Sequence, residues 1–195
     1  MKTSLNVIRA EHRALAAIIH GLHYLVEQIR KGGPKPDFKV FRAMVYYIDT
    51  FPEKLHHPKE DRYLFRMLHE RTQEANSVLE SLEAQHIRGA ALIRELEQAL
   101  LRWEAGGDAF FPEFVRQVEH YSDFHWKHMR EEEDFVLPLA ERVLTAEDWK
   151  EIDAAFAGNA DPLVGNDLQK DFNKLFSQIV SLAPPPIGVG PEPAG

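Results

Sequence analysis

The sequence predicts an all-α protein: an antiparallel, up-down-up-down four-helix bundle with a helical extension at its C-terminal end. Apolar residues recur at helical spacing over four long stretches, and short connections join these stretches. No stretch shows the alternation of apolar and polar residues that is typical of a strand. Because short loops place consecutive helices side by side in opposite directions, the four stretches predict a bundle.

The first two expected helices are separated by a turn rich in glycine and proline. The first spans about residues 4–30, and the second runs from an N-cap at Asp37 to about residue 71. Pro52 and Pro58 interrupt the second helix, and each lacks a backbone N–H. We therefore expect the helix to be kinked there, since the apolar spacing resumes on both sides.

Further helices are expected along the rest of the chain. A third spans about residues 74–103, and a fourth runs from about Phe111 to Val143 with Pro112 in its first turn. Thr145–Asp148 resembles a capping box and would open a short fifth helix. A sixth helix is expected further on. The predicted segments are a bundle over residues 1–144, a helical extension over 145–182 with the sixth helix at about 166–182, and a disordered tail over 183–195.

The composition narrows the classes of function. The net charge is −8 without a stripe of lysines and arginines, which argues against a nucleic-acid partner. No run approaches the roughly 18 apolar residues of a membrane span, and the start shows no apolar leader, so we expect a soluble, cytoplasmic protein. Because the chain has ten histidines and no cysteine, any metal must be held by histidines and carboxylates.

Two stretches of the chain repeat the same pair of residues. His56 precedes Glu60 by four positions, and His128 precedes Glu132 by four positions. Residues four apart on a helix share one face, with Cβ atoms roughly 5–6 Å apart. An imidazole and a carboxylate at this spacing can bind the same metal ion. The alternative is that both stretches are solvated helix faces, since each is rich in charged residues.

Histidines on the first and third expected helices can lie at the height of these pairs. Antiparallel helices rise by about 1.5 Å per residue in opposite directions. For each pair of neighbouring helices, we compared the number of residues that separate a histidine or glutamate of each helix from the turn between them. One histidine of each helix then falls at the same level, within one residue. His23 would lie roughly 16 Å from that level. The side chains expected in one layer are His12, His56, Glu60, His86, His128 and Glu132.

A layer of four histidines and two glutamates predicts a metal site. Such groups would be costly to bury in an apolar bundle unless they are paired or coordinated. Two carboxylates from opposite helices can each bridge two ions, so the natural stoichiometry is two metals. Each ion would have two histidines of its own and share both glutamates. A ligand set of nitrogen and oxygen without sulfur suits iron, manganese or zinc.

These residues and their spacing resemble the hemerythrin-like, or HHE cation-binding, family over roughly residues 5–143. The resemblance implies two non-haem iron ions with carboxylate bridges and a bridging oxo or hydroxo group, with manganese or zinc as possible replacements. It also implies a small-molecule ligand such as O2, NO or peroxide. The residues that carry it are His12, His56–Asp61 followed by Leu64-Phe65, Gln85-His86, and His128 with Glu132 followed by Leu137-Pro138.

The sequence departs from the oxygen-carrying hemerythrins on the third helix. Those proteins have a second histidine four residues beyond the first, where this chain has Ala90 beside Gly89. Four histidines with two glutamates resemble more closely the bacterial repair-of-iron-centres proteins, whose N-terminal cysteine-containing domain is not present in this sequence. Gly89 and Ala90 leave space, and we expect an open coordination position that O2, NO, peroxide or water can occupy.

The other histidines and two tyrosines are expected outside the ligand set. His57 is one residue from His56, hence turned about 100° away on an α-helix, and is expected at the surface or behind the ligands. His125 lies one turn before His128 and is expected to line the pocket and form hydrogen bonds, although it could be a fifth ligand. Surface, core-edge or packing positions are expected for His20, His23, His69, His120, Tyr63 and Tyr121.

Three functions are compatible with such a site. The first is binding or sensing of O2, NO or peroxide. The second is that of a redox enzyme or an iron donor in the repair of iron centres, and the third is that of a metal-storage or structural bundle. No acid or base can be told apart from the ligands, so the sequence assigns no catalytic residue. Ferritin-like Glu-x-x-His spacing occurs once, at Glu83 and His86, which argues against storage. The C-terminal helices could cover the site or form a homodimer interface.

Overall fold

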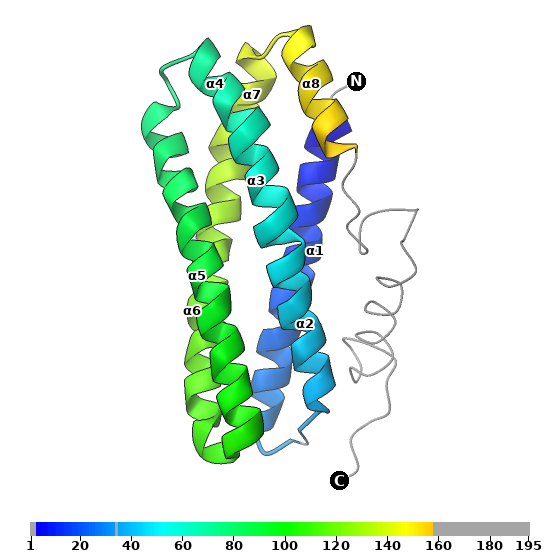
Figure 1. Cartoon of the computed structure of the whole chain (residues 1–195), viewed down its shortest axis with the longest axis vertical. Helices are drawn as coiled ribbons and strands as arrows, with labels where there is room; N and C mark the ends of the chain where they lie inside the picture. Colours follow the sequence, from blue (N-terminus) through cyan, green and yellow to red (C-terminus); the bar gives the residue numbers. More distant parts are fainter. Residues whose placement is uncertain (1–2, 34, 158–195) are drawn as a thin grey trace.

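The protein folds as a bundle of long helices that run side by side (Figure 1). The computed structural model describes residues 3–33 and 35–157. Within these ranges the chain is helical and contains no strand, which confirms the all-α prediction. Among the helices described, none has the length and apolar content that crossing a membrane requires. The sixth helix expected over residues 166–182 and the tail over 183–195 lie outside the described residues.

The first helix, α1 (Thr3–Arg30), ends where the sequence predicts. Gly32 follows it with a φ of +81°, a conformation that glycine adopts without steric cost. α2 (Phe38–Thr50) begins after Asp37, whose carboxylate accepts a hydrogen bond from the backbone N–H of Lys39 at 2.8 Å. The predicted N-cap is therefore confirmed.

The interruption predicted at the prolines of the second bundle helix takes the form of two π-helical turns. Pro52 has no N–H to donate, and the backbone N–H of His56 donates to the carbonyl of Phe51, five residues back, at 3.0 Å. These wider turns keep the path helical where an α-helical hydrogen bond is missing. Beyond α2 the helix consists of η1 (Pro52–His56), α3 (His57–Lys59), η2 (Glu60–Phe65) and α4 (Arg66–Arg71).

A tight turn joins the third and fourth bundle helices. The third, α5 (Asn76–Gly106), starts two residues and ends three residues later than the sequence predicts. Gly107 follows with a φ of +83° and leads into the 3-10 turn η3 (Asp108–Phe110). The fourth bundle helix then consists of α6 (Phe111–Glu131), the π-helical turn η4 (Glu132–Val136) and α7 (Leu137–Val143).

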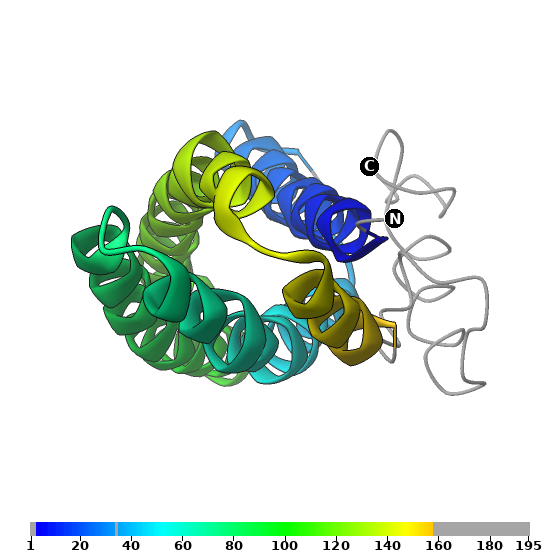
Figure 2. The same cartoon turned by 90° about the horizontal axis from the view of Figure 1, so that it is seen from above.

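A short helix, α8 (Ala146–Phe156), lies at one end of the bundle beside α1 (Figure 2). The predicted capping box is present, since Thr145 accepts a hydrogen bond from the backbone N–H of Asp148 and Asp148 accepts one from that of Thr145. The Asp148 carboxylate also accepts two hydrogen bonds from Arg71 of α4, at 2.8 and 2.9 Å. These contacts attach α8 to the end of the second bundle helix.

The bundle has two apolar clusters, one on each side of a layer of polar residues. On α1, Leu5 and Ile8 belong to one cluster and Leu15 to the other, and His12 lies between them. The other bundle helices also pass from one cluster to the other at this level. Polar groups in the middle of an apolar core must find partners there, because water cannot solvate them.

Asp148 is expected to stabilise the packing of α8. Asp148→Ala removes one of the two hydrogen bonds of the capping box and both hydrogen bonds from Arg71, and we expect the free energy of unfolding to fall by about 1–2 kcal/mol. The pair with Arg71 contributes to this loss, because Asp148 is buried and accepts two hydrogen bonds from the guanidinium. Chemical denaturation followed by circular dichroism measures the change. The control Lys150→Ala removes an exposed side chain of the same helix and should change that free energy by less than about 0.5 kcal/mol. Equal effects would contradict the role of Asp148.

Candidate metal centre

The structure brings the six side chains of the expected layer together inside the bundle. The four histidines come from four different helices, and the two glutamates are the first residues of the π-helical turns η2 and η4. All six are buried, and Glu60 and Glu132 are only 0 % and 1 % exposed. Their ligand atoms form two groups in which all atoms lie within 4.8 Å of one another: His12, His56, Glu60 and Glu132 in one, and Glu60, His86, His128 and Glu132 in the other.

Each glutamate turns one oxygen toward each group of histidines. Glu60 Oε1 lies 3.3 Å from His56 Nε2, and Glu60 Oε2 lies 3.7 Å from His86 Nε2. Glu132 Oε2 lies 3.1 Å from His12 Nε2, and Glu132 Oε1 lies 3.6 Å from His86 Nε2. A carboxylate with one oxygen in each group can bridge two ions, so the geometry suits a two-metal site.

Most of the atoms that face the centre of the layer form no hydrogen bond within the described part of the chain. They include both oxygens of Glu60, both oxygens of Glu132, and Nε2 of His86 and of His128. Buried polar atoms without partners cost free energy. Two cations would satisfy them, and a set of imidazoles and carboxylates suits iron, manganese or zinc. The residues present therefore fit a pair of metal ions.

The second ring nitrogen, Nδ1, of each histidine contacts an acceptor on a neighbouring bundle helix. Each acceptor is next in sequence to a residue of the layer, so the four contacts form a closed ring around the bundle. Metal-binding histidines usually donate this nitrogen to such a partner, which fixes the tautomer and leaves Nε2 for the metal. The contacts are His56 with Glu11 at 2.7 Å, His86 with Asp61 at 2.6 Å, His128 with Gln85 at 3.1 Å and His12 with Glu133 at 2.9 Å.

Neighbouring carboxylates raise the pKa of three of these histidines. Burial would lower the pKa of His56, but Glu60 and Glu11 outweigh it and raise that pKa well above its ordinary value. Burial would lower the pKa of His12, but Glu132 and Glu133 outweigh it and raise that pKa to about 9. Burial would also lower the pKa of His86, but Asp61 and Glu132 raise it to about 10. A metal binds neutral imidazole, so metal binding near pH 7 would displace protons from these three rings.

A second buried cluster, formed by Glu53, His57, Tyr121 and His125, adjoins the layer. Tyr121 donates a hydrogen bond to Glu53 Oε1 at 2.8 Å, and Nε2 of His125 lies 3.2 Å from the same oxygen. His57 Nδ1 lies 3.3 Å from Glu53 Oε2. His57 is only 3 % exposed, so the surface position considered for it is wrong. Tyr121 does more than pack, as its hydroxyl belongs to this polar cluster.

Two features of the cluster bear on its protonation. Burial would raise the pKa of Glu53, but hydrogen bonds with His125 and His57 outweigh it and hold that pKa well below its ordinary value. Burial, together with the charge of His86, lowers the pKa of His57 well below its ordinary value. The cluster therefore combines a charged carboxylate with a neutral imidazole at His57.

The spacing along an α-helix does not predict His57 at the site, because adjacent residues point in different directions. In a bundle, however, a helix buries a broad face, and two adjacent residues can face two different neighbours. His56 faces α1, with 3.2 Å between its Nε2 and Nε2 of His12. His57 faces α5, and its ring stacks on that of His86 with 4.3 Å between centroids. The sequence contains one signal for the buried position of His57: Glu53 precedes it by four residues, so the two side chains can meet on one helix face.

The space expected beside Gly89 is filled. A Cβ added to Gly89 would lie 3.1 Å from both carboxylate oxygens of Glu53. The absence of a side chain at this position makes room for the buried carboxylate, so it does not create an open coordination position there.

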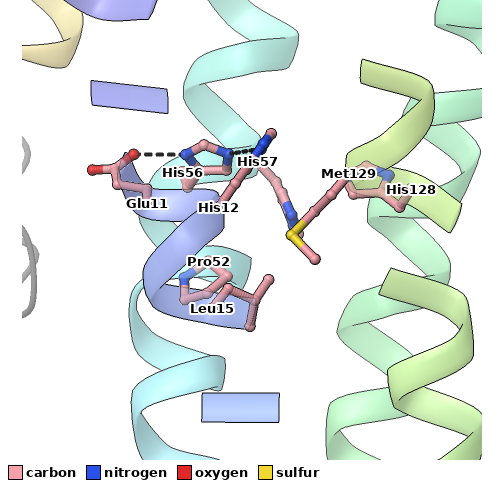
Figure 3. A pocket seen from close by; sticks show the side chains of 8 residues that line it. All are labelled: Glu11, His12, Leu15, Pro52, His56, His57, His128 and Met129. Atoms are coloured by element: carbon pink, nitrogen blue, oxygen red, sulfur yellow. Dashed lines mark hydrogen bonds and ion pairs between the residues drawn. The ribbon is translucent and has the colours of Figure 1, made fainter. Parts of the chain in front are cut away.

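A small cavity lies instead beside the histidines on the side of α1 (Figure 3). The space open to the centre of a water-sized molecule is about 10 Å³, roughly what one such molecule needs. In Figure 3 the sulfur of Met129 points from α6 toward the histidines. The cavity can hold only a very small ligand. Its walls are formed by Glu11, His12, Leu15, Pro52, His56, His57, His128 and Met129.

His20, His23, His69 and His120 lie away from the site, as expected. His20 and His120 are exposed, and His23 and His69 are partly buried. Tyr63 is partly buried and packs against the apolar cluster on the α8 side of the layer. His125 is buried next to Glu53 and belongs to neither of the two groups of the layer.

The helical bundle and its buried layer of histidines and glutamates define a hemerythrin-like protein with a site suited to metal ions. The family model for the hemerythrin HHE cation binding domain matches residues 3–140, from α1 into α7. The chain therefore belongs to the hemerythrin HHE cation-binding domain family. No curated protein and no solved structure matches it significantly.

Proposed function

We propose that this protein holds two iron ions in the layer and binds a small molecule, O2, NO or peroxide, beside them. The observation that carries the proposal is the geometry of Glu60 and Glu132. Their four oxygens are buried, form no hydrogen bond within the described residues and face two separate groups of histidines. Membership of a cation-binding family supports the same conclusion.

The proposal gives each residue of the layer a role. The bound iron pair would supply the capacity to bind O2 or NO and to exchange electrons with them. The chain would orient the ligands before the metal arrives, because the ring of Nδ1 contacts fixes the direction of each Nε2. His12 and His56 would bind one ion, His86 and His128 the other, and Glu60 and Glu132 would bridge the two.

The cavity supports a ligand of two or three atoms. A surface groove of about 350 Å³ also has His12 and Met129 among its walls. These two side chains line both the groove and the cavity, so they separate the small enclosed space from the open surface. We infer that a small molecule reaches the cavity from the groove by passing Met129.

Metal content tests the proposal. Protein produced without added metal should contain two iron ions per chain, as measured by plasma mass spectrometry. The double variant Glu60→Ala, Glu132→Ala should lose both ions together, because each carboxylate contacts both groups of histidines. The control variant Glu80→Ala, Glu147→Ala removes two exposed carboxylates and should keep both ions. Retention of both ions without Glu60 and Glu132 would contradict the proposal, and manganese or zinc in their place would contradict iron.

Access to the cavity is expected to depend on Met129. Met129→Ala should open the wall between the groove and the cavity, so azide should bind several-fold faster to the ferric protein. Stopped-flow absorption at the band that azide produces with ferric iron measures this rate. The control Met44→Ala removes another buried methionine of the same apolar cluster and should leave the rate unchanged. Equal acceleration in both variants would indicate a general loosening of the bundle and would contradict this route.

A further inference from the structure

We propose that His57 is a fifth histidine ligand, which binds the same ion as His86 and His128. The inference rests on the two-metal site proposed above and adds a residue to it. Its consequence is an asymmetric centre, with three imidazoles on one ion and two on the other.

The first observation is that His57 has the same kind of Nδ1 partner as the four histidines of the layer. Glu53 Oε2 lies 3.3 Å from His57 Nδ1. An imidazole whose Nδ1–H points to a carboxylate presents the lone pair of Nε2 on the far side of the ring. Such a partner is usual for metal-binding histidines. With Nδ1 donating to Glu53, His57 would have the orientation and tautomer that a ligand needs.

The second observation is the position of the His57 ring. One ring nitrogen of His57 lies within 4.8 Å of a ring nitrogen of His86 and of one of His128, and those two lie within 4.8 Å of each other. Metal–nitrogen bonds of about 2.0–2.1 Å hold opposite ligands about 4.2 Å apart. Only two of three ligands can lie opposite each other, and neighbouring ligands of one ion lie about 3–3.5 Å apart. The three nitrogens would therefore move closer together by up to about 1–2 Å on binding one ion.

The third observation is that the carboxylate behind His57 is itself fixed in place. Tyr121 donates to Glu53 Oε1 at 2.8 Å, and Nε2 of His125 lies 3.2 Å from that oxygen. Gly89 leaves the room that the carboxylate occupies. A buried carboxylate is costly unless it is paired. These contacts pair Oε1 and leave Oε2 to orient His57.

The number of protein ligands decides which ion keeps an open position, because the cavity adjoins both. His12 and His56 of the first ion line it, and so do His57 and His128 of the second (Figure 3). With three imidazoles and two bridging carboxylates, the second ion has five protein ligands and the first has four. The ion with fewer protein ligands, held by His12 and His56, therefore keeps the open coordination position.

The alternative role for His57 is a hydrogen bond to a small molecule in the cavity, since His57 also lines that space. In that case the centre would have four histidine ligands. The number of imidazoles that bind metal distinguishes the two roles.

Proton NMR of the protein loaded with Co²⁺, a paramagnetic ion, measures this number. Each metal-bound imidazole that keeps a ring N–H gives one strongly shifted resonance that disappears in D2O. The wild-type protein with two bound Co²⁺ ions should give five such resonances, and His57→Ala should give four. Glu53→Gln should give five resonances, one of them at a changed chemical shift, because the partner of the His57 N–H changes.

A matched control and the wild-type count make the outcomes distinct. His120→Ala removes an exposed histidine of α6 and should leave all five resonances in place. Two bound ions with four resonances in the wild-type protein would overturn the role of His57 and leave the two-metal site standing. A wild-type protein that binds no Co²⁺ would overturn the two-metal site itself. If His57→Ala fails to fold, the number of resonances in the wild-type protein and the changed shift in Glu53→Gln still decide whether His57 binds metal.

Discussion

Two buried carboxylates in the middle of an apolar bundle set the requirements that the rest of the structure meets. Glu60 and Glu132 are almost completely buried, and apolar clusters lie on both sides of them. Since water cannot solvate their charge, it must be balanced by the surrounding histidines or by cations bound between them. The histidines alone leave all four carboxylate oxygens without a hydrogen bond within the described residues. A pair of cations would satisfy these oxygens.

The backbone is adapted to this layer in two ways. Both glutamates begin a π-helical turn, a feature that often occurs at functional sites. A π turn shifts the angular position of every residue after it, so one helix can present a histidine–glutamate pair to the layer and an apolar face to the cluster beyond. The closed ring of Nδ1 contacts then links the four bundle helices at the same level. The site and the packing of the bundle are therefore parts of one arrangement.

The sequence predicts much of this arrangement, because helical periodicity and rise are local properties. The turn lengths and the rise per residue are enough to place His12 and His86 at the level of the two histidine–glutamate pairs. The roles of His57 and Gly89 could not be predicted, since they depend on how each helix is rotated against its neighbours. Pro52 signals an interruption, but the sequence does not say that a π turn would accommodate it.

The residues that accept from the Nδ1 atoms can be predicted from the sequence only in part. Each of them lies directly beside a residue of the layer in the sequence, as Glu11 lies beside His12 and Asp61 beside Glu60. That adjacency is visible in the chain. The sequence does not show which histidine each acceptor contacts, because that histidine lies on the next helix and the contact depends on the packing of the bundle.

The positions of the metal ions test the central claim most directly. Crystals of the iron-loaded protein, measured at the iron absorption edge, should show two anomalous peaks about 3.5–4 Å apart. One peak should lie beside His12 and His56 and the other beside His86 and His128. A single peak, or peaks only at surface carboxylates, would mean that the buried glutamates are balanced without a metal pair and would contradict the account.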